Sequence, residues 1–209
     1  MKTESLGGFD RFRVPAALLV IAIHTGPLLS LNGEANYLLT DILARIAVPF
    51  FFSVSGWFLV PRLLREGRAA LIPFVKKLLL LYGAAVLLYL PLNLYNHTLE
   101  ESGFSLLRDV LFNGTFYHLW YFPALVLGAC LVYGLLRILG PRWAWLPALL
   151  LYAAGLLGDS YFGLTAALPP LRAGYEALFL LFDYTRNGLF FPPVFLLLGG
   201  WLALRPARR

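Results

Sequence analysis

The feature that most constrains this chain is a series of apolar stretches, each close to the length that crosses a membrane. A helix needs about 20 mainly apolar residues to span the hydrocarbon core of a bilayer. Six such stretches are separated by gaps that carry Gly, Pro, Asn and charged residues. We therefore predict an all-α integral membrane protein in which residues 1–209 form a single membrane domain. The predicted spans cover about residues 12–31, 38–60, 74–95, 118–137, 143–158 and 188–204.

The composition excludes a water-soluble globule. Of the 209 residues, 60% are hydrophobic and 13% are charged, whereas soluble domains have roughly 45–50% apolar and about 25% charged residues. The net charge of +6 lies in short clusters between the apolar stretches, which indicates membrane topology rather than nucleic-acid binding. Cys130 is the single cysteine. It excludes an intramolecular disulfide and a cysteine-cluster zinc site, and we expect no metal site.

The basic residues predict an orientation, because short cytoplasmic loops retain Lys and Arg. Three basic residues, Arg108, Arg172 and Arg186, fall in the alternate loops, together with most of the acidic residues. We predict that both termini face the cytoplasm and that loops 96–117 and 159–187 face outward, with segment 175–184 lying in the interface or re-entering the membrane. The basic residues on the predicted cytoplasmic side are Lys2, Arg11, Arg13, Arg62, Arg65, Arg68, Lys76, Lys77, Arg137, Arg142, Arg205, Arg208 and Arg209.

The first span carries two candidate functional residues, Arg13 and His24. Eleven residues make three helical turns, so both side chains project from one face, about 16 Å apart along the axis. Asp10 stands three residues before Arg13 and is placed to pair with it. Arg13 is either a topology anchor or a functional group. For His24 we favour function, because it lies inside the span beside Thr25 and a helix-loosening Gly-Pro pair.

The second span adds Asp41, Arg45 and Ser55 as ligand candidates. Arg45 falls at about the depth of His24, so we expect these two side chains to line one outward cavity. The alternative is that Asp41 and Arg45 neutralise each other within one helix. Pro49 predicts a kink, and Ser53 to Gly56 would allow close packing against the first span.

His118 begins the fourth span in an aromatic sequence, Tyr117-His118-Leu119-Trp120-Tyr121. Aromatic belts are ordinary at membrane interfaces. His118 is therefore an interface residue unless it faces the same outer cavity as His24. It completes the set of candidate site residues.

Several motifs in order carry a family resemblance. They are Gly8-Phe9-Asp10-Arg11-Phe12-Arg13, the spacing from Arg13 to His24, Val48-Pro49-Phe50-Phe51-Phe52-Ser53-Val54-Ser55-Gly56 and His118-Leu119-Trp120-Tyr121. Together they resemble the acyltransferase 3 family of membrane acyltransferases. Within it, Gly158-Asp159-Ser160-Tyr161 and Asp183-Tyr184-Thr185-Arg186-Asn187-Gly188 are similar to the transmembrane part of the vancomycin-resistance serine racemases.

The resemblance implies a multi-pass protein of the bacterial plasma membrane. Such proteins move an acyl group, usually acetyl, from cytoplasmic acyl-CoA to a hydroxyl of an extracytoplasmic carbohydrate or a related acceptor. It places Arg13 on the donor side and His24 as the catalytic histidine, with acyl-CoA as co-substrate and no bound cofactor. The partners implied are the lipid bilayer, the donor and the acceptor, with no nucleic acid. His24 would act as general base or carry a transient acyl group, and Arg45 would stabilise an oxyanion or an anionic ligand group.

Two departures from the family pattern lead to further expectations. Family members generally have about ten spans, so a six-span chain is expected to be a truncated version, and an oligomer or a second subunit would complete the cavity. The racemase relatives also carry a soluble pyridoxal-phosphate domain, and the lysines here, Lys2, Lys76 and Lys77, lie at the terminus or the membrane edge. We therefore expect no racemase chemistry. The alternatives to acyl transfer are a transport module for serine or a similar small amino acid, and an inactive family member.

Overall fold

The computed structural model describes residues 7–96, 103–116 and 118–205, and all regular secondary structure within them is helical. The all-α prediction is confirmed for this part of the chain. The longer helices are α1 (Gly7–Thr25), α3 (Ala47–Glu66), α4 (Arg68–Tyr95), α6 (Tyr121–Trp143), α7 (Trp145–Gly158) and α10 (Pro192–Leu204). The shorter elements are α2 (Gly33–Tyr37), α5 (Gly103–Arg108), α8 (Phe162–Ala166), α9 (Pro169–Leu178), the π-helices η1 (Leu38–Ile42) and η3 (Asp109–Asn113), and the 3₁₀ helix η2 (Leu43–Ile46).

Each predicted span overlaps one of the six longer helices, and α1, α3, α4 and α6 extend beyond the predicted bounds. By length and composition, three continuous helical segments can cross a membrane, and two shorter helices are also strongly apolar. The count of six spans and the cytoplasmic termini stay predictions. The three long segments are Gly33–Glu66, Arg68–Tyr95 and Tyr121–Trp143, and the two shorter helices are Trp145–Gly158 and Pro192–Leu204.

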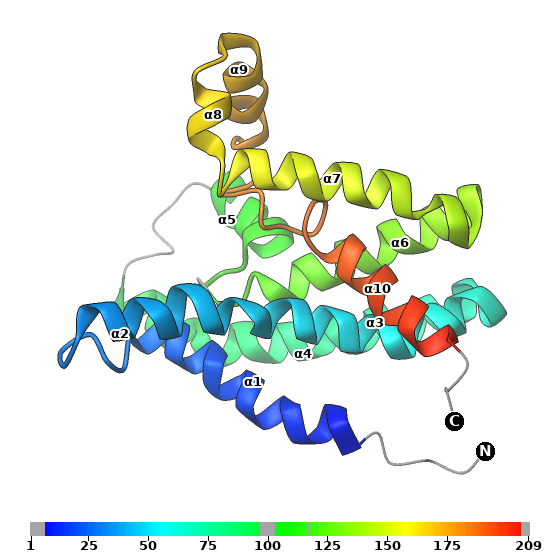
Figure 1. Ribbon diagram of the computed structural model, residues 1–209, viewed down its shortest axis with the longest axis horizontal. Helices are drawn as coiled ribbons and strands as arrows, with labels where there is room; N and C mark the ends of the chain where they lie inside the picture. Colours follow the sequence, from blue (N-terminus) through cyan, green and yellow to red (C-terminus); the bar gives the residue numbers. More distant parts are fainter. Residues whose placement is uncertain (1–6, 97–102, 117, 206–209) are drawn as a thin grey trace.

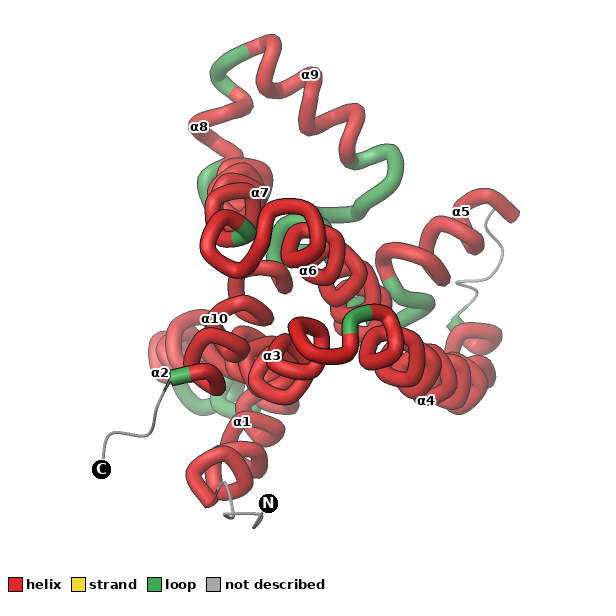
Figure 2. Tube along the Cα trace, turned by 90° about the vertical axis from the view of Figure 1, so that its right-hand side faces the viewer, coloured by secondary structure: helices red, strands yellow, loops and turns green. Residues whose placement is uncertain are grey.

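The longer helices run back and forth between two ends of the molecule (Figure 1). The first turn of α1 and the last turn of α10 lie at the same end, whereas α2, α5, α8 and α9 gather toward the other. Viewed from the side at right angles, α3 and α10 occupy the middle, with α1, α4, α6 and α7 around them (Figure 2). The longer helices thus follow an alternating up-and-down path, with short connections from α3 to α4 and from α6 to α7 and longer ones from α4 to α6 and from α7 to α10.

Local sequence explains where the helices begin and end. Asn32 caps α2 by accepting a hydrogen bond from the backbone N–H of Ala35 at 3.0 Å. Gly67 separates α3 from α4 with φ at +59°, a conformation that side chains with a Cβ rarely adopt. Pro192 and Pro193 open α10, where the missing N–H groups cost no helical hydrogen bond.

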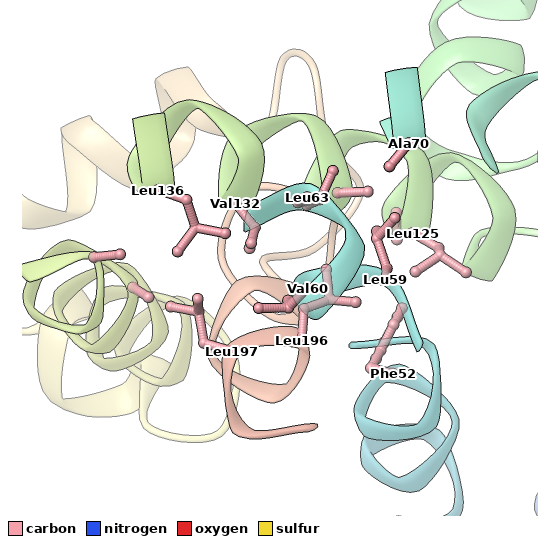
Figure 3. Packing of buried hydrophobic residues seen from close by; sticks show 14 of the residues in the cluster. Phe52, Leu59, Val60, Leu63, Ala70, Leu125, Val132, Leu136, Leu196 and Leu197 are labelled. Atoms are coloured by element: carbon pink, nitrogen blue, oxygen red, sulfur yellow. The ribbon is translucent and has the colours of Figure 1, made fainter. Parts of the chain in front are cut away.

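The core lies where α3, α6 and α10 meet (Figure 3). Small residues let α3 and α10 approach closely: a Cβ added at Gly56 would collide with the backbone of Leu196, and one at Gly199 with the backbone of Ser53. Helices in membranes associate through such small-residue contacts, because the lipid supplies no hydrophobic drive. The prediction that Gly56 packs against the first span is wrong, since the partner of Gly56 is α10.

α1 packs on α3 through aromatic rings instead. The ring centroids of Phe9 and Trp57 are 5.0 Å apart, and those of Phe12 and Phe50 are 4.8 Å apart. Edge-to-face pairs at these distances add about 0.5–1.5 kcal/mol beyond the area they bury. The predicted contact between the first two spans is thus confirmed, with different residues at the interface.

Polar side chains tie η3 to the segment that follows α9. Asn113 donates to the Asp109 carboxylate at 2.9 Å and accepts from the backbone N–H of Asp183 at 3.1 Å. Arg108 forms ion pairs with the carboxylates of Asp109 and Asp183. Asn113 is buried, so loss of these bonds would leave its amide without compensation for lost hydration.

The segment predicted to lie in the interface or re-enter, 175–184, begins on α9 and continues as irregular backbone toward α10. Tyr175 is buried and donates to the carbonyl of Ala154 on α7 at 2.7 Å. Burial raises the pKa of Tyr175, which keeps this phenol a neutral donor. Just beyond the segment, Thr185 donates to the carbonyl of Gly155 at 2.6 Å. The segment after α9 therefore returns against the C-terminal half of α7.

Candidate functional site

His24 and His118 face each other, although 94 positions of sequence separate them. His24 lies in the last turn of α1, which ends at Thr25, before Gly26 with φ at +54°. His118 lies in the turn that leads into α6. The centroids of the two imidazole rings are 5.8 Å apart. The structure thus brings together the two histidines that the sequence singled out.

Aromatic rings hold the imidazole of His118. Its centroid lies 4.6 Å from that of Tyr89 on α4 and 5.1 Å from that of Phe116, both in edge-to-face geometry. Such contacts favour defined ring orientations, because the positive edge of one ring meets the negative face of another. His118 is therefore positioned by α4 as well as by its own segment.

Both histidines line a cavity of about 600 Å³. Its walls come from α1, α3, α4 and the start of α6, and most of them are apolar. Apolar pockets with a few convergent polar groups are the usual form of small-molecule sites. The other lining residues are Ala17, Val20, Ile21, Thr25, Val48, Phe51, Tyr89, Leu119, Trp120, Tyr121 and Phe122. We call this space the histidine cavity.

Arg13 lies on α1, three helical turns before His24, toward the end of the molecule where the chain starts. Its guanidinium forms an ion pair with Asp10 at 3.0 Å, and both side chains are about half exposed. The predicted Asp10–Arg13 pair is confirmed. An exposed pair contributes roughly 0–1 kcal/mol to stability, so this one orients Arg13 without fixing it strongly.

Asp41 and Arg45 do not join the histidine cavity. They form an ion pair at 3.0 Å within their own segment, and Thr40 donates to the second carboxylate oxygen at 2.9 Å. The expectation that Arg45 and His24 line one cavity is wrong. Between them the chain passes through π-helix η1 and 3₁₀ helix η2, which change the direction of the side chains from that of a regular helix.

The Asp41–Arg45 pair lines a second cavity of about 460 Å³, which we call the charged cavity. Across it lies another pair, Arg186 and Asp159, with Nε and Oδ2 2.8 Å apart. This contact is an ion pair without hydrogen-bond alignment. Ser160 also lines the cavity. The charged cavity therefore presents two cations and two anions to a ligand.

The assignment of candidates from sequence missed Asp159 and Arg186 as cavity residues. Their charge and their place in a predicted loop do not indicate which helix ends that loop approaches. The available signal was the pair of motifs around Gly158-Asp159-Ser160 and Thr185-Arg186-Asn187. These two motifs meet in the structure, because Arg186 pairs with Asp159 and Thr185 bonds to Gly155 in the last turn of α7.

Ser55 lies on α3 and is half-buried. Its hydroxyl donates to the backbone carbonyl of Phe51 at 2.9 Å and also interacts with the phenol of Tyr121. A mid-helix serine that bonds to the carbonyl four residues earlier is a common arrangement. In the described part of the chain, Ser55 lines neither the histidine cavity nor the charged cavity.

Comparison with known proteins gives a family and bacterial relatives. Residues 6–209 match the model of the acyltransferase domain. An amino-acid racemase of Enterococcus faecalis is 45% identical over 209 residues, which cover 99% of this chain and 29% of the relative. A serine/alanine racemase of Enterococcus gallinarum is 45% identical over 202 residues, which cover 92% and 28%. No solved structure matches the chain.

The match covers nearly all of this chain but only part of each relative. The chain spans less than a third of the length of the relatives it matches. The family model, in contrast, covers almost every residue here, including all of the helices that build the two cavities. The chain therefore belongs to the acyltransferase 3 family of membrane acyltransferases.

Proposed function

We propose that this protein transfers an acyl group, acetyl in the simplest case, from cytoplasmic acyl-CoA to a hydroxyl of an extracytoplasmic carbohydrate or related acceptor. Membership of the acyltransferase family supports the reaction class. The observation that carries the site is the facing pair His24 and His118 in a mainly apolar cavity. Apolar walls suit an acyl chain, and two imidazoles supply groups that take up and release protons near neutral pH.

In the proposed step, His24 takes the proton of the acceptor hydroxyl while the hydroxyl oxygen attacks the thioester carbonyl. The new carbon–oxygen bond forms, the carbon–sulfur bond breaks, and the proton held by His24 goes to the departing CoA thiolate. His118 donates a hydrogen bond to the oxyanion that develops on the carbonyl. The low-dielectric walls strengthen that interaction relative to water.

In this proposal, Arg13 binds the phosphates of the acyl-CoA donor. The phosphates of CoA are anionic, and a guanidinium binds phosphate through paired donors. Arg13 is half exposed and lies on the same helix as His24, nearer the end predicted to face the cytoplasm. One helix, α1, would then carry both Arg13, which binds the donor, and His24, which takes up the proton. The proposed location is the plasma membrane of a bacterium, with a second subunit or copy able to complete the donor path.

The test is transfer from radiolabelled acetyl-CoA to acceptor in proteoliposomes that contain the purified full chain. Replacing His24 with Ala should lower the rate by about 10²- to 10⁴-fold, the usual worth of general base catalysis. Its yield and thermal unfolding in detergent should match wild type, because His24 is more than a third exposed and lies at a helix end. Full transfer by the His24→Ala protein would refute the role of His24.

The charged cavity favours a second candidate function, binding and uptake of a small amino acid. A zwitterion carries one cation and one anion, and the two ion pairs Asp41–Arg45 and Asp159–Arg186 offer a partner for each. The matched relatives are named for amino-acid and serine/alanine racemization. Serine uptake in the same proteoliposomes, lost in Arg186→Gln but kept in His24→Ala, would support this candidate over acyl transfer.

A further inference from the structure

A basic cavity and an apolar groove meet at the end of the molecule that is predicted to face the cytoplasm. The basic cavity, about 460 Å³, lies at the turn between α3 and α4 and is bounded by Arg65, Arg68 and Arg137. The groove, about 550 Å³, runs between α4 and α6. Arg68 and Tyr133 line both spaces, so the two form one continuous surface. Neither space contains a residue of the two cavities described above.

The charges of the basic cavity are only partly balanced. Its carboxylate, Glu66, lies 3.8 Å from Arg65 and 3.3 Å from Arg62. Within the described ranges of the chain, no carboxylate lies within ion-pair distance of Arg68 or Arg137. Two arginines therefore present guanidinium groups that no acidic side chain of the described chain neutralises.

The groove changes character along its length. Arg68 stands at its basic end, Lys76 lies about two helical turns further along α4, and the remaining wall is apolar apart from the phenol of Tyr133. The apolar wall comprises Leu71, Ile72, Val75, Leu79, Leu80 and Cys130. Cys130 lies seven residues before Arg137 on α6, about 10 Å deeper along the helix. An occupant must therefore have an anionic head and an apolar tail that reaches at least that far.

We infer that this surface binds an anionic glycerophospholipid, with the phosphodiester at Arg68 and Arg137 and one acyl chain in the groove between α4 and α6. Basic pockets between transmembrane helices on the cytoplasmic side are known to recognise anionic lipid headgroups. The phenol of Tyr133, at the junction of the two spaces, is placed to donate to a phosphate oxygen. The inference needs a membrane-embedded chain and goes beyond the proposed acyl transfer.

The phosphates of CoA share the same chemistry as a lipid phosphate, but the pantetheine arm of CoA carries polar amides and is a poorer match than a hydrocarbon chain for an apolar groove. We commit to the lipid because the groove continues directly from the basic cavity. The experiment must therefore separate the two sources. It measures lipid retained by the purified full chain in detergent, by native mass spectrometry, after equilibration with equal amounts of phosphatidylglycerol and phosphatidylcholine. A parallel sample contains added CoA.

Wild type should retain phosphatidylglycerol in preference to phosphatidylcholine, and CoA should not release it. Arg68→Gln together with Arg137→Gln should weaken retention by about 25-fold, roughly fivefold for each charge removed. Arg142→Gln, which removes an exposed charge at the same end of α6 outside both spaces, is the matched control and should bind as wild type does. Val75→Trp should reduce retention without changing charge, because the larger side chain fills the groove.

Three results would overturn the lipid site. Equal retention of the two lipids by wild type would show that the surface does not distinguish an anionic lipid from a zwitterionic one. An unchanged preference in the Arg68→Gln/Arg137→Gln protein would place the lipid elsewhere. Release of phosphatidylglycerol by CoA would assign the surface to the nucleotide.

If the double variant does not fold, Val75→Trp and the charge-retaining pair Arg68→Lys/Arg137→Lys provide the same comparison. Retention that is lost in Val75→Trp and kept in the lysine pair supports the site. All of these readouts are independent of acyl transfer.

Discussion

The two histidines of the candidate site are held in different ways. His118 packs against the rings of Tyr89 and Phe116, whereas His24 lies on the last turn of α1 and is more exposed. A helix end followed by Gly26 in a left-handed conformation leaves the backbone of His24 less constrained. We therefore assign proton transfer to His24 and a fixed donor role to His118.

His118→Phe tests this division of roles. Phenylalanine preserves the ring packing against Tyr89 but removes both imidazole nitrogens, so the fold should be unchanged and acyl transfer should fall by about 10²- to 10³-fold, as it does when an oxyanion donor is lost. Rates in proteoliposomes and thermal unfolding in detergent measure the two effects. Tyr89→Phe, which keeps the ring at the same place, is the control and should retain most activity. An unchanged rate in His118→Phe would show that the imidazole nitrogens of His118 take no part in the reaction.

Arg13→Lys separates donor binding from topology. Lysine keeps the positive charge that anchors the helix but loses the planar fork that binds phosphate. The KM for acyl-CoA should rise about tenfold with little change in stability, because the Asp10–Arg13 pair is exposed. Arg11→Lys, on the same helix and also exposed, is the matched control. An unchanged KM in Arg13→Lys would show that Arg13 is only an anchor.

Single residues also show where sequence reasoning ends. The 3.6-residue period predicted that Arg13 and His24 share a helix face, and the i, i+3 spacing predicted the Asp10–Arg13 pair. Depth alone then grouped Arg45 with His24, yet Arg45 lines the charged cavity. Depth follows from position in an apolar stretch, whereas the direction of a side chain around the axis depends on η1 and η2, whose irregular turns leave no clear pattern in the sequence.

At the scale of elements, the contact between α3 and α10 organises the core. Gly56 on α3 and Gly199 on α10 lie where a Cβ would meet the opposite backbone. The sequence predicted that Gly56 permits a close approach. It could not predict the partner helix, because any apolar helix with small residues satisfies the same requirement. α10 lies more than 130 residues away along the chain, and only the packing of the whole bundle selects it.

Gly199→Ala should therefore destabilise the protein by about 1–3 kcal/mol, the usual cost of forcing extra atoms into a packed core. The opposing group is the carbonyl of Ser53, part of a helix backbone that cannot move independently. Unfolding in detergent, followed by circular dichroism, measures the change. Gly83→Ala on α4 is the matched control, because nothing lies within 4 Å of its added Cβ. Alanine there should be neutral or stabilising by up to about 1 kcal/mol. Equal stability of Gly199→Ala and wild type would contradict the close α3–α10 contact.

For the whole molecule, the same sequence pattern that predicted the helices also predicts how they are oriented. Each of the six predicted spans overlaps one of the longer helices, and residues of several helices line each of the two cavities. Hydropathy reports where helices lie because every backbone polar group in lipid must bond within its own helix. It does not report which helices surround a shared space, and both cavities combine segments from distant parts of the chain.

The orientation can be tested with single cysteines in a Cys130→Ala background, in intact cells. Cysteines at Gly33 and Gly163 should react with a membrane-impermeant thiol reagent added outside, because both positions are exposed at the predicted outer end and have no atoms near an added Cβ. Cysteines at Ala69 and Arg142, exposed at the opposite end, should react only after the membrane is permeabilised. The prediction follows from thirteen basic residues on one side against three on the other. Labelling of the cysteine at position 69 in intact cells would show that the topology is the reverse of the predicted one. Arg13 would then lie on the side away from cytoplasmic acyl-CoA, which would rule out the donor-side role proposed for α1.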